Sequence, residues 1–463
     1  MNKHVTSNNT PIIERFSEAT VVGLGVSGYS AARYLAKRGL LVKVVDTRPY
    51  PALAEKLRQE YPDIETHFGS LRTALVKNAE VLVVSPGVSL SMPELAEAKE
   101  QGATLVGDVE LFLQNNTRPL IAITGSNGKS TVTTLVGQMC VGAGLNPLVA
   151  GNIGEPVLNA LTDESNYDVA VLELSSFQLE TTSSVPAESA TILNISADHM
   201  DRYTSMGDYV LAKARIMRGA KRAVLSRHEP DLEQITNNAD VVSFGLDQPS
   251  ENDSFGVVRK KTGRWLVKGD QPLMLLREVP LVGLHNVLNV LAAFALTDCL
   301  NLATKDLVEA VKSFEGLPHR MQTVAVKNGV TFVNDSKATN TGAASTALNN
   351  LEQPVYWIAG GEGKGANFDE LAEALPETLE KAILIGRDAK LIEDAVKSKV
   401  EAVHANSLSH AVELAANDAI EGSVVLLSPA CASFDMFDGF EARGQAFVDA
   451  VNSLNVGGVG GKL

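Results

Sequence analysis

The chain has 463 residues, of which 45% are hydrophobic and 21% charged, a globular composition that excludes a largely disordered protein. Its net charge of −15, from 40 Lys and Arg against 55 Asp and Glu, disfavours binding to nucleic acid or to an anionic membrane. Three widely spaced cysteines (Cys140, Cys299 and Cys431) and the lack of a long apolar run favour a cytoplasmic location, without a secretory signal or membrane span.

Short apolar runs alternate with helical patterns along the chain. This alternation predicts an α/β fold with mainly parallel sheets. The predicted strands are residues 20–25, 42–46, 81–85, 120–124, 169–174, 190–196, 222–226, 356–360, 381–386 and 424–428. The clearest predicted helices are residues 30–39, 130–139 and 286–300.

The first Gly-rich turn, Gly23-Leu24-Gly25-Val26-Ser27-Gly28, matches GxGxxG between a predicted strand and a predicted helix. Asp46 ends the next strand. Such a turn places a diphosphate at a helix N-terminus with an acid nearby. NAD and nucleotide sugars both carry a diphosphate, so an NAD-dependent oxidoreductase is one hypothesis.

The second Gly-rich turn, Gly125-Ser126-Asn127-Gly128-Lys129-Ser130-Thr131, also lies between a strand and a helix. Backbone N–H groups of such a turn bind phosphates, Lys129 would reach the β- and γ-phosphates, and Ser130 would bind Mg²⁺. The full GxxxxGK[ST] motif is not met, because residue 123 is Ile. Glu173 ends a buried strand, where an acid commonly holds Mg²⁺. A P-loop nucleotide switch is therefore a second hypothesis.

The third Gly-rich turn begins at Gly360, and the three turns together predict three separate sheets. A polar joint at residues 113–119 and a Gly- and Pro-containing joint at 314–318 separate them. We therefore predict a Rossmann-like domain at residues 1–109, a P-loop domain at 110–316 and a second Rossmann-like domain at 317–463, in line with about 150 residues per domain.

A series of motifs in fixed order resembles the Mur ligases, the ATP-dependent amide ligases of peptidoglycan synthesis. The motifs are TGSNGKST, ELSSFQ, NISADHMDRY, GLHNVLN, LPHRMQ, NDSKATN, GGEGKG and SPACASFD, and the resemblance extends over about residues 21–447. The N-terminal GLGVSG, with Asp46-Thr47-Arg48 and Ser85-Pro86-Gly87, is similar to the members that add D-glutamate. Folylpolyglutamate synthase shares the ATP loop but lacks such an N-terminal domain.

The resemblance implies a reaction. ATP phosphorylates the carboxylate of UDP-N-acetylmuramoyl-L-alanine, the amine of D-glutamate attacks the acyl phosphate, and a tetrahedral intermediate expels phosphate. It also implies Mg²⁺ as cofactor, ATP as co-substrate, and a third domain that binds the amino acid and closes on ATP. We expect a monomer without nucleic-acid or membrane partners.

The resemblance also implies roles for individual residues. The implied catalytic residues are Lys129, His199 and Lys213, and Lys213 is implied to be carbamylated. The implied Mg²⁺ ligands are Ser130, Glu173, His199 and carbamylated Lys213. The implied ATP site comprises Gly125, Ser126, Asn127, Gly128, Lys129, Ser130, Thr131, Asn152, Asn289, Arg320 and Asp335. The implied UDP site comprises Val26, Ser27, Asp46, Thr47, Arg48 and Gly87, and the implied D-glutamate site comprises Lys337, Thr339, Lys364, Ser433 and Phe440. Without the resemblance, Lys213 would be interpreted as a surface lysine on a helix.

Overall fold

The computed structural model describes residues 11–71, 76, 78–200, 202–236, 238–281 and 283–454. The sequence suggests no role for residues 1–20 or for the Gly-rich tail, and of these segments residues 1–10 and 455–463 lie outside the described ranges. The described chain forms two compact units. Unit 1 contains the residues up to Ile195 with Gly207–Met274 and Val290–Val311, and unit 2 contains Ser196–Met206, Leu275–Asn289 and the residues from Lys312 onward.

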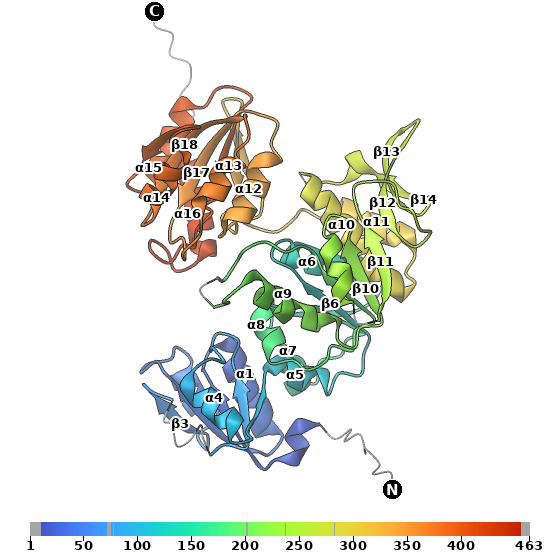
Figure 1. Cartoon of the computed structure of the whole chain (residues 1–463), viewed down its shortest axis with the longest axis vertical. Helices are drawn as coiled ribbons and strands as arrows, with labels where there is room; N and C mark the ends of the chain where they lie inside the picture. The colour runs from blue at the N-terminus through green and yellow to red at the C-terminus, as the bar shows by residue number, and fades with distance from the viewer. Residues whose placement is uncertain are drawn as a thin grey trace, which may run out of the picture. The chain divides into compact units, whose positions relative to one another are not determined.

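The first sheet, in unit 1, has the parallel order β3-β2-β1-β4-β5. Its strands are β1 (Glu18–Val22), β2 (Leu41–Asp46), β3 (Glu65–Phe68), β4 (Val81–Val84) and β5 (Thr104–Val106). Its helices are α1 (Val26–Lys37), α2 (Ala54–Glu60), α4 (Pro93–Glu100) and α5 (Asp108–Leu113) (Figure 1). The strand order reverses between β1 and β4, and ligands of such sheets bind at the carboxyl ends of the strands beside that point. The first Gly-rich turn leaves β1 there.

The second sheet has nine strands in the order β14-β13-β12-β11-β10-β9-β6-β8-β7. Strand β6 (Leu120–Thr124) lies between β9 (Ser189–Ile192) and β8 (Val169–Glu173), and all three are parallel. The other strands are β7 (Pro147–Gly151), β10 (Arg222–Ser226), β11 (Asp240–Phe244), β12 (Phe255–Lys260), β13 (Gly263–Lys268) and β14 (Gln271–Leu275). The helices along this part of the chain are α6 (Lys129–Gly142), α7 (Val157–Thr162), α8 (Ser176–Glu180), α9 (Met206–Ala214), α10 (Leu284–Thr297) and α11 (Thr304–Lys312). The central position of β6 places the second Gly-rich turn between the ends of two neighbouring strands.

The third sheet, in unit 2, has the order β15-β16-β20-β17-β18-β19, with β15 antiparallel to β16. Its strands are β15 (Gln322–Lys327), β16 (Val330–Asn334), β17 (Val355–Gly360), β18 (Leu379–Ile385), β19 (Glu401–His404) and β20 (Val424–Leu427). Helices α12 (Thr341–Asn349), α13 (Phe368–Glu373) and α14 (Ala389–Val396) pack on one face, and α15 (Leu408–Asp418) and α16 (Phe440–Ser453) on the other (Figure 1).

The predicted α/β fold with three sheets is confirmed. Every predicted strand overlaps an observed one, and the three predicted helices correspond to α1, α6 and α10. The prediction missed β12, β13 and β14, which run antiparallel at least between β12 and β13. It also missed β11, the short outer strands β3, β5, β7 and β19, and the hairpin of β15 and β16. Among the described residues, no helix is both long enough and apolar enough to cross a membrane.

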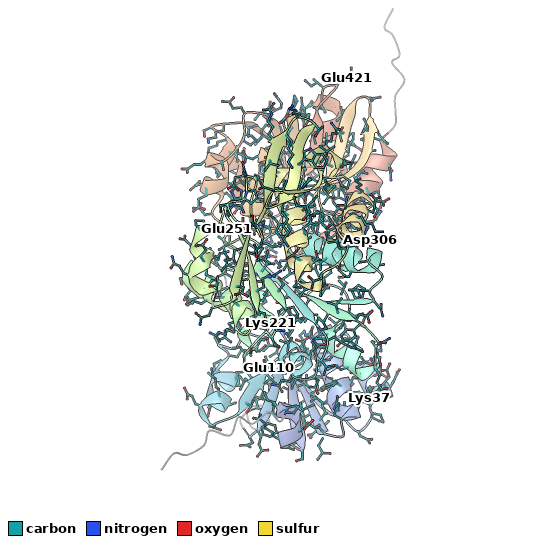
Figure 2. The ribbon with its side chains drawn as sticks, turned by 90° about the vertical axis from the view of Figure 1, so that its right-hand side faces the viewer. Lys37, Glu110, Lys221, Glu251, Asp306 and Glu421 are labelled. Carbon is teal, nitrogen blue, oxygen red and sulfur yellow. The ribbon has the colours of Figure 1, made fainter. Side chains whose placement is uncertain are left out.

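Direct polar contacts join the first and second sheets within unit 1. Arg33 of α1 forms an ion pair with Asp163, next to the end of α7. The Lys37 ammonium donates to the carbonyl of Thr162 at 3.0 Å. The Glu110 carboxylate of α5 accepts from the backbone N–H of Ser183 at 2.8 Å; Lys37 and Glu110 are labelled in Figure 2.

Candidate active site

The second Gly-rich turn is held in shape by an asparagine of the neighbouring strand connection. Gly125 and Gly128 have φ values of 151° and 82°, which glycine adopts without a steric penalty, and Gly128 is the N-cap of α6. The N–H of Asn127 donates to Asn194 Oδ1 at 2.8 Å, and Asn194 Nδ2 donates to the carbonyl of Asn127 at 3.1 Å. The turn is therefore pre-formed at a helix N-terminus, where anions bind.

Two lysine ammonium groups converge on this turn. Lys129 Nζ and Lys213 Nζ each donate to the carbonyl oxygen of Gly125, both at 2.9 Å. Lys213 is only 2% exposed, and its ammonium lies 4.5 Å from the centre of the Tyr209 ring. The interpretation of Lys213 as a surface lysine is therefore wrong, because α9 packs this face against the turn. Two cations at one carbonyl, beside the N-terminus of α6, concentrate positive charge in a way that favours an anion.

Glu173, the last residue of β8, has a buried carboxylate. The side chain is 1% exposed, and Asn152 Nδ2 donates to its Oε1 at 2.8 Å. No described protein atom forms a hydrogen bond with Oε2. A buried carboxylate oxygen without a partner is costly unless a ligand or cation satisfies it, and Mg²⁺ prefers such oxygens. Glu173 therefore fits the predicted role of a magnesium ligand.

The other predicted metal ligands are distributed between the two units. Ser130 and Lys213 belong to unit 1 with Glu173, whereas His199 belongs to unit 2. His199 has a φ of 56°, and its Nε2 lies 3.7 Å from Asp198 Oδ2. Within the described residues, no three His, Cys, Asp or Glu side chains form a metal-binding cluster.

The predicted ATP residues are divided in the same way. The turn and Asn152 belong to unit 1, whereas Asn289, Arg320 and Asp335 belong to unit 2. Asn289 is buried in α10, where its Nδ2 donates to Asn286 Oδ1 at 3.1 Å, so the two asparagines share a helix face as the spacing predicts.

Asp335 is a buried acid directly after β16. Its Oδ2 accepts from Ser428 Oγ at 2.9 Å, and its Oδ1 accepts from the N–H of Met321 at 3.1 Å. Burial raises the pKa of Asp335 to about 7, and the two hydrogen bonds only partly oppose this effect. The carboxyl group is thus close to half-protonated at neutral pH.

The first Gly-rich turn packs tightly at the end of β1. A Cβ on Gly28 would lie 1.9 Å from the carbonyl oxygen of Gly23, so only glycine fits there. Asp46 is 3% exposed and accepts from the N–H of Leu24 at 2.7 Å and from Arg48 Nε at 2.9 Å. Burial acts to raise the pKa of Asp46, but the hydrogen bonds from Arg48 and Leu24 outweigh it and hold that pKa below its ordinary value.

The remaining predicted UDP residues lie around this turn. Val26 and Ser27 begin α1, and Thr47 and Gly87 follow β2 and β4. Val26, Thr47, Arg48 and Gly87 are exposed. The structure therefore places the whole predicted UDP set at the carboxyl ends of β1, β2 and β4.

The predicted D-glutamate residues follow three neighbouring strands of the third sheet. Lys337 and Thr339 follow β16, Lys364 follows β17, and Ser433 follows β20. Phe440 begins α16, and the Lys337 ammonium lies 3.8 Å from the centre of its ring, a cation–π contact. The carboxyl ends of parallel strands meet at one edge of a sheet, so these residues lie at the same edge.

Family models match most of the chain. The Mur ligase MurD-like N-terminal domain matches residues 17–107, the Mur ligase middle domain matches residues 123–297, and the Mur ligase glutamate ligase domain matches residues 319–431. The chain belongs to the Mur ligase family. Family membership favours neither an NAD-dependent oxidoreductase nor a nucleotide switch.

Two curated Mur ligases are similar to the chain over nearly its whole length. The UDP-N-acetylmuramoylalanine–D-glutamate ligases of Methylobacillus flagellatus and Pseudomonas aeruginosa are each 46% identical, over 94% of this chain and 97% of the relative. Among solved structures, a pseudomurein peptide ligase from Methanothermus fervidus has a TM-score of 0.59 at 18% identity, covering 95% of this chain and 100% of that one. A UDP-N-acetylmuramate–alanine ligase from Thermotoga maritima has a TM-score of 0.57 at 20% identity, with the same coverage. These structures share the three-domain α/β fold.

The sequence did not predict the roles of three further residues of this Mur ligase. Asn194 holds the second Gly-rich turn, and Tyr209 contacts both Lys213 and Ser126, its hydroxyl lying 3.2 Å from Ser126 Oγ. Asn194 lies two residues after the end of β9, and this position could have indicated its role because β9 neighbours β6. Arg443 is 1% exposed, and no spacing in the sequence indicates that this arginine of a helix is buried.

Proposed function

We propose that the chain is an ATP-dependent ligase that joins D-glutamate to UDP-N-acetylmuramoyl-L-alanine, releasing ADP and phosphate, in peptidoglycan precursor synthesis. The observation that carries this proposal is the 46% identity, over 94% of the chain, to ligases named for that reaction. The match to a glutamate ligase domain over residues 319–431 supports the same amino acid.

The second Gly-rich turn (residues 125–131), called the phosphate turn from here on, supports phosphorylation of a carboxylate by ATP. Both the carboxylate and the γ-phosphate are anions, so their approach has to be offset by positive charge. Lys129 supplies that charge at the carbonyl of Gly125, and the N-terminus of α6 adds its dipole. Lys129 would follow the transferring phosphoryl group, since its flexible side chain already reaches across the turn.

We propose that Ser130 and Glu173 hold one Mg²⁺, that His199 is a ligand of a second, and that a carbamate on Lys213 is a further metal ligand. When bound, the metal supplies further positive charge for the phosphates. The unsatisfied Oε2 of Glu173 supports this set, and Asn152 orients the carboxylate through its other oxygen. A buried ammonium on Lys213 would repel a cation, whereas a carbamate would offer it an oxygen.

The amino-acid site supports a dianionic substrate. Lys337 and Lys364 can pair with carboxylates, and Ser433 and Thr339 can donate hydroxyl hydrogen bonds. In the first domain, Arg48 and the N-terminus of α1 suit the uridine diphosphate. The domain limits 1–109, 110–316 and 317–463, the closing of the third domain on ATP, the cytoplasmic location and the monomeric state stay predictions.

The proposal is tested by measuring phosphate release from ATP in the presence of Mg²⁺. UDP-N-acetylmuramoyl-L-alanine and D-glutamate are each omitted in turn. We expect release only when both UDP-N-acetylmuramoyl-L-alanine and D-glutamate are present, and none with L-glutamate. A folded Lys129→Ala variant should release no phosphate. Release without either substrate would indicate a nucleotide switch, and no release from the folded wild-type protein would contradict the ligase assignment.

A further inference from the structure

One arginine side chain lies inside the third domain, directly behind the predicted amino-acid site. Arg443 is 1% exposed and belongs to the first turns of α16, the helix that Phe440 begins. An arginine is almost never fully buried unless its guanidinium donors are satisfied. The oxygens that accept from Arg443 therefore show what this side chain holds in place.

The guanidinium bonds to the loops that carry the predicted D-glutamate residues. Its Nε and one NH₂ group donate to the Oγ and the carbonyl of Ser336, at 3.0 and 2.8 Å. Its other NH₂ group donates to the carbonyl of Cys431 at 3.1 Å and approaches that of Gly360 at 3.5 Å. Ser336 and Cys431 lie in the loops after β16 and β20, shortly before Lys337 and Ser433, and Gly360 is the last residue of β17, at the start of the loop that carries Lys364.

The same network reaches the aromatic residue of the site. Ser336 Oγ, which accepts from Arg443, donates to the carbonyl of Phe440 at 2.9 Å. The ring of Phe440 in turn lies 3.8 Å from the Lys337 ammonium. A single guanidinium thus ties together the segments that carry Lys337, Lys364, Ser433 and Phe440.

The charge of Arg443 also bears on the site. Every oxygen that accepts from it among the described residues belongs to a carbonyl or a hydroxyl, so no hydrogen-bonded carboxylate neutralises it. Burial lowers its pKa to about 10, which leaves the guanidinium protonated at neutral pH. A buried positive charge in a medium of low dielectric favours anions nearby.

We propose that Arg443 is the positioning residue of the amino-acid site, because its planar fork fixes the spacing of the loops that present Lys337, Lys364 and Ser433 to a dicarboxylic amino acid. This inference rests on the proposed function. In this inference Arg443 does not contact the substrate. It sets the geometry of the binding groups, on which the affinity for D-glutamate and the choice between D- and L-glutamate depend. Lysine cannot replace it, since one ammonium lacks the planar set of donors.

The test compares the full-length wild-type enzyme with Arg443→Lys, which keeps the charge and loses the fork. We expect the KM for D-glutamate to rise at least about tenfold, as for a small misplacement of binding groups. The ratio of kcat/KM for D-glutamate to that for L-glutamate should fall. The KM values for ATP and UDP-N-acetylmuramoyl-L-alanine should stay within about twofold of the wild-type values. The rate at which hydroxylamine traps the acyl phosphate, a reaction that needs no D-glutamate, should also stay within about twofold of the wild-type rate.

The matched control loosens the same helix from its other end. Lys327 Nζ donates to the carbonyls of Val451, Asn452 and Leu454, at 2.6, 3.1 and 3.0 Å. Lys327→Met should therefore lower the melting temperature without changing the KM for D-glutamate. An equal rise of that KM in Lys327→Met would show that Arg443 acts only through stability, and would overturn the proposal.

A milder variant covers the case in which Arg443→Lys does not fold. Ser336→Ala removes only the hydroxyl that links Arg443 to Phe440, and should raise the KM for D-glutamate in the same selective way. An unchanged KM in a folded Arg443→Lys, or in Ser336→Ala where the first variant does not fold, contradicts the inference alone. A wild-type protein that forms no product with D-glutamate contradicts the proposed function as well.

Discussion

At the scale of single residues, the phosphate turn concentrates groups whose burial is expensive without a ligand. Lys213 is 2% exposed and its ammonium donates to the carbonyl of Gly125, and Glu173 is 1% exposed with no hydrogen-bond partner for its Oε2 among the described residues. Fully buried lysines and glutamates are rare in proteins because desolvation penalises their charged forms. Their burial here is consistent with a site that is completed by metal and phosphate.

Lys213 provides the first prediction at this scale. Lys213→Ala should lose nearly all activity, because the proposed carbamate oxygen disappears together with the side chain. Added acetate or formate should restore part of the phosphate release, since a short carboxylate can occupy the vacated space. Lys129→Ala serves as the control and should not respond to carboxylate. Full activity of Lys213→Ala without additives would refute the carbamate proposal.

Asp335 provides a prediction on pH. Its folded-state pKa is about 7, above the ordinary value of 3.8. The folded protein therefore binds more protons than the unfolded chain between those two values, so this residue makes the protein less stable as the pH rises from about 4 to about 7. Asp335→Asn removes this dependence, and its amide can still accept from Met321 and donate to Ser428.

The measurement is the melting temperature of both proteins without nucleotide across this pH range. The difference between Asp335→Asn and the wild type should increase in favour of the variant from about pH 4 to about pH 7 and stay level above it. A difference that does not change with pH would show that the Asp335 carboxyl titrates normally.

At the scale of elements, the close approach of β7 and β8 sets the position of Glu173. Gly151, the last residue of β7, has a φ of 110°, and a Cβ there would lie 2.2 Å from the carbonyl oxygen of Glu173. The N–H of Asn152 donates to that same oxygen at 2.8 Å. The backbone of β7 thus holds both the strand end and the asparagine that orients the carboxylate.

Gly151→Ala should therefore reduce phosphate release by about a hundredfold, because the displaced strand end carries Glu173 with it. Gly144→Ala is the matched control: Gly144 has a φ of 85°, with no atom within 4 Å of an added Cβ. Both variants should lose about 1–2 kcal/mol of stability from positive-φ strain, and Gly151→Ala should lose more because its Cβ meets the Glu173 carbonyl, but only Gly151→Ala should lose activity. Equal activities of the two folded variants would disprove the role of this contact.

At the scale of the whole molecule, the sequence was sufficient for the elements that carry the Gly-rich turns. β1, β6 and β17 are mainly apolar strands that end at or just before a glycine, a pattern that is typical of buried parallel strands. The phosphate turn with Lys129 could be predicted because its chemistry is local, with turn, cation and helix start adjacent in the chain.

The parts that could not be predicted depend on contacts between distant residues. β12 and β13 are partly exposed and antiparallel, so they lack the continuous apolar pattern. Lys213 is buried because α9 packs on a turn formed 88 positions earlier. Arg443 is buried because its acceptors come from two separate loops and from the last residue of β17. The spacing of apolar residues within α9 or α16 does not indicate that Lys213 or Arg443 is buried.

The measurement that tests the central claim most directly follows one oxygen atom. UDP-N-acetylmuramoyl-L-alanine is labelled with a heavy isotope of oxygen in its free carboxylate and converted with ATP, Mg²⁺ and D-glutamate. If the carboxylate is phosphorylated before the amine attacks, one labelled oxygen leaves with the phosphate, and we predict that mass spectrometry finds the label in the released phosphate. Phosphate without the label, formed together with the glutamyl product, would contradict an acyl-phosphate ligase.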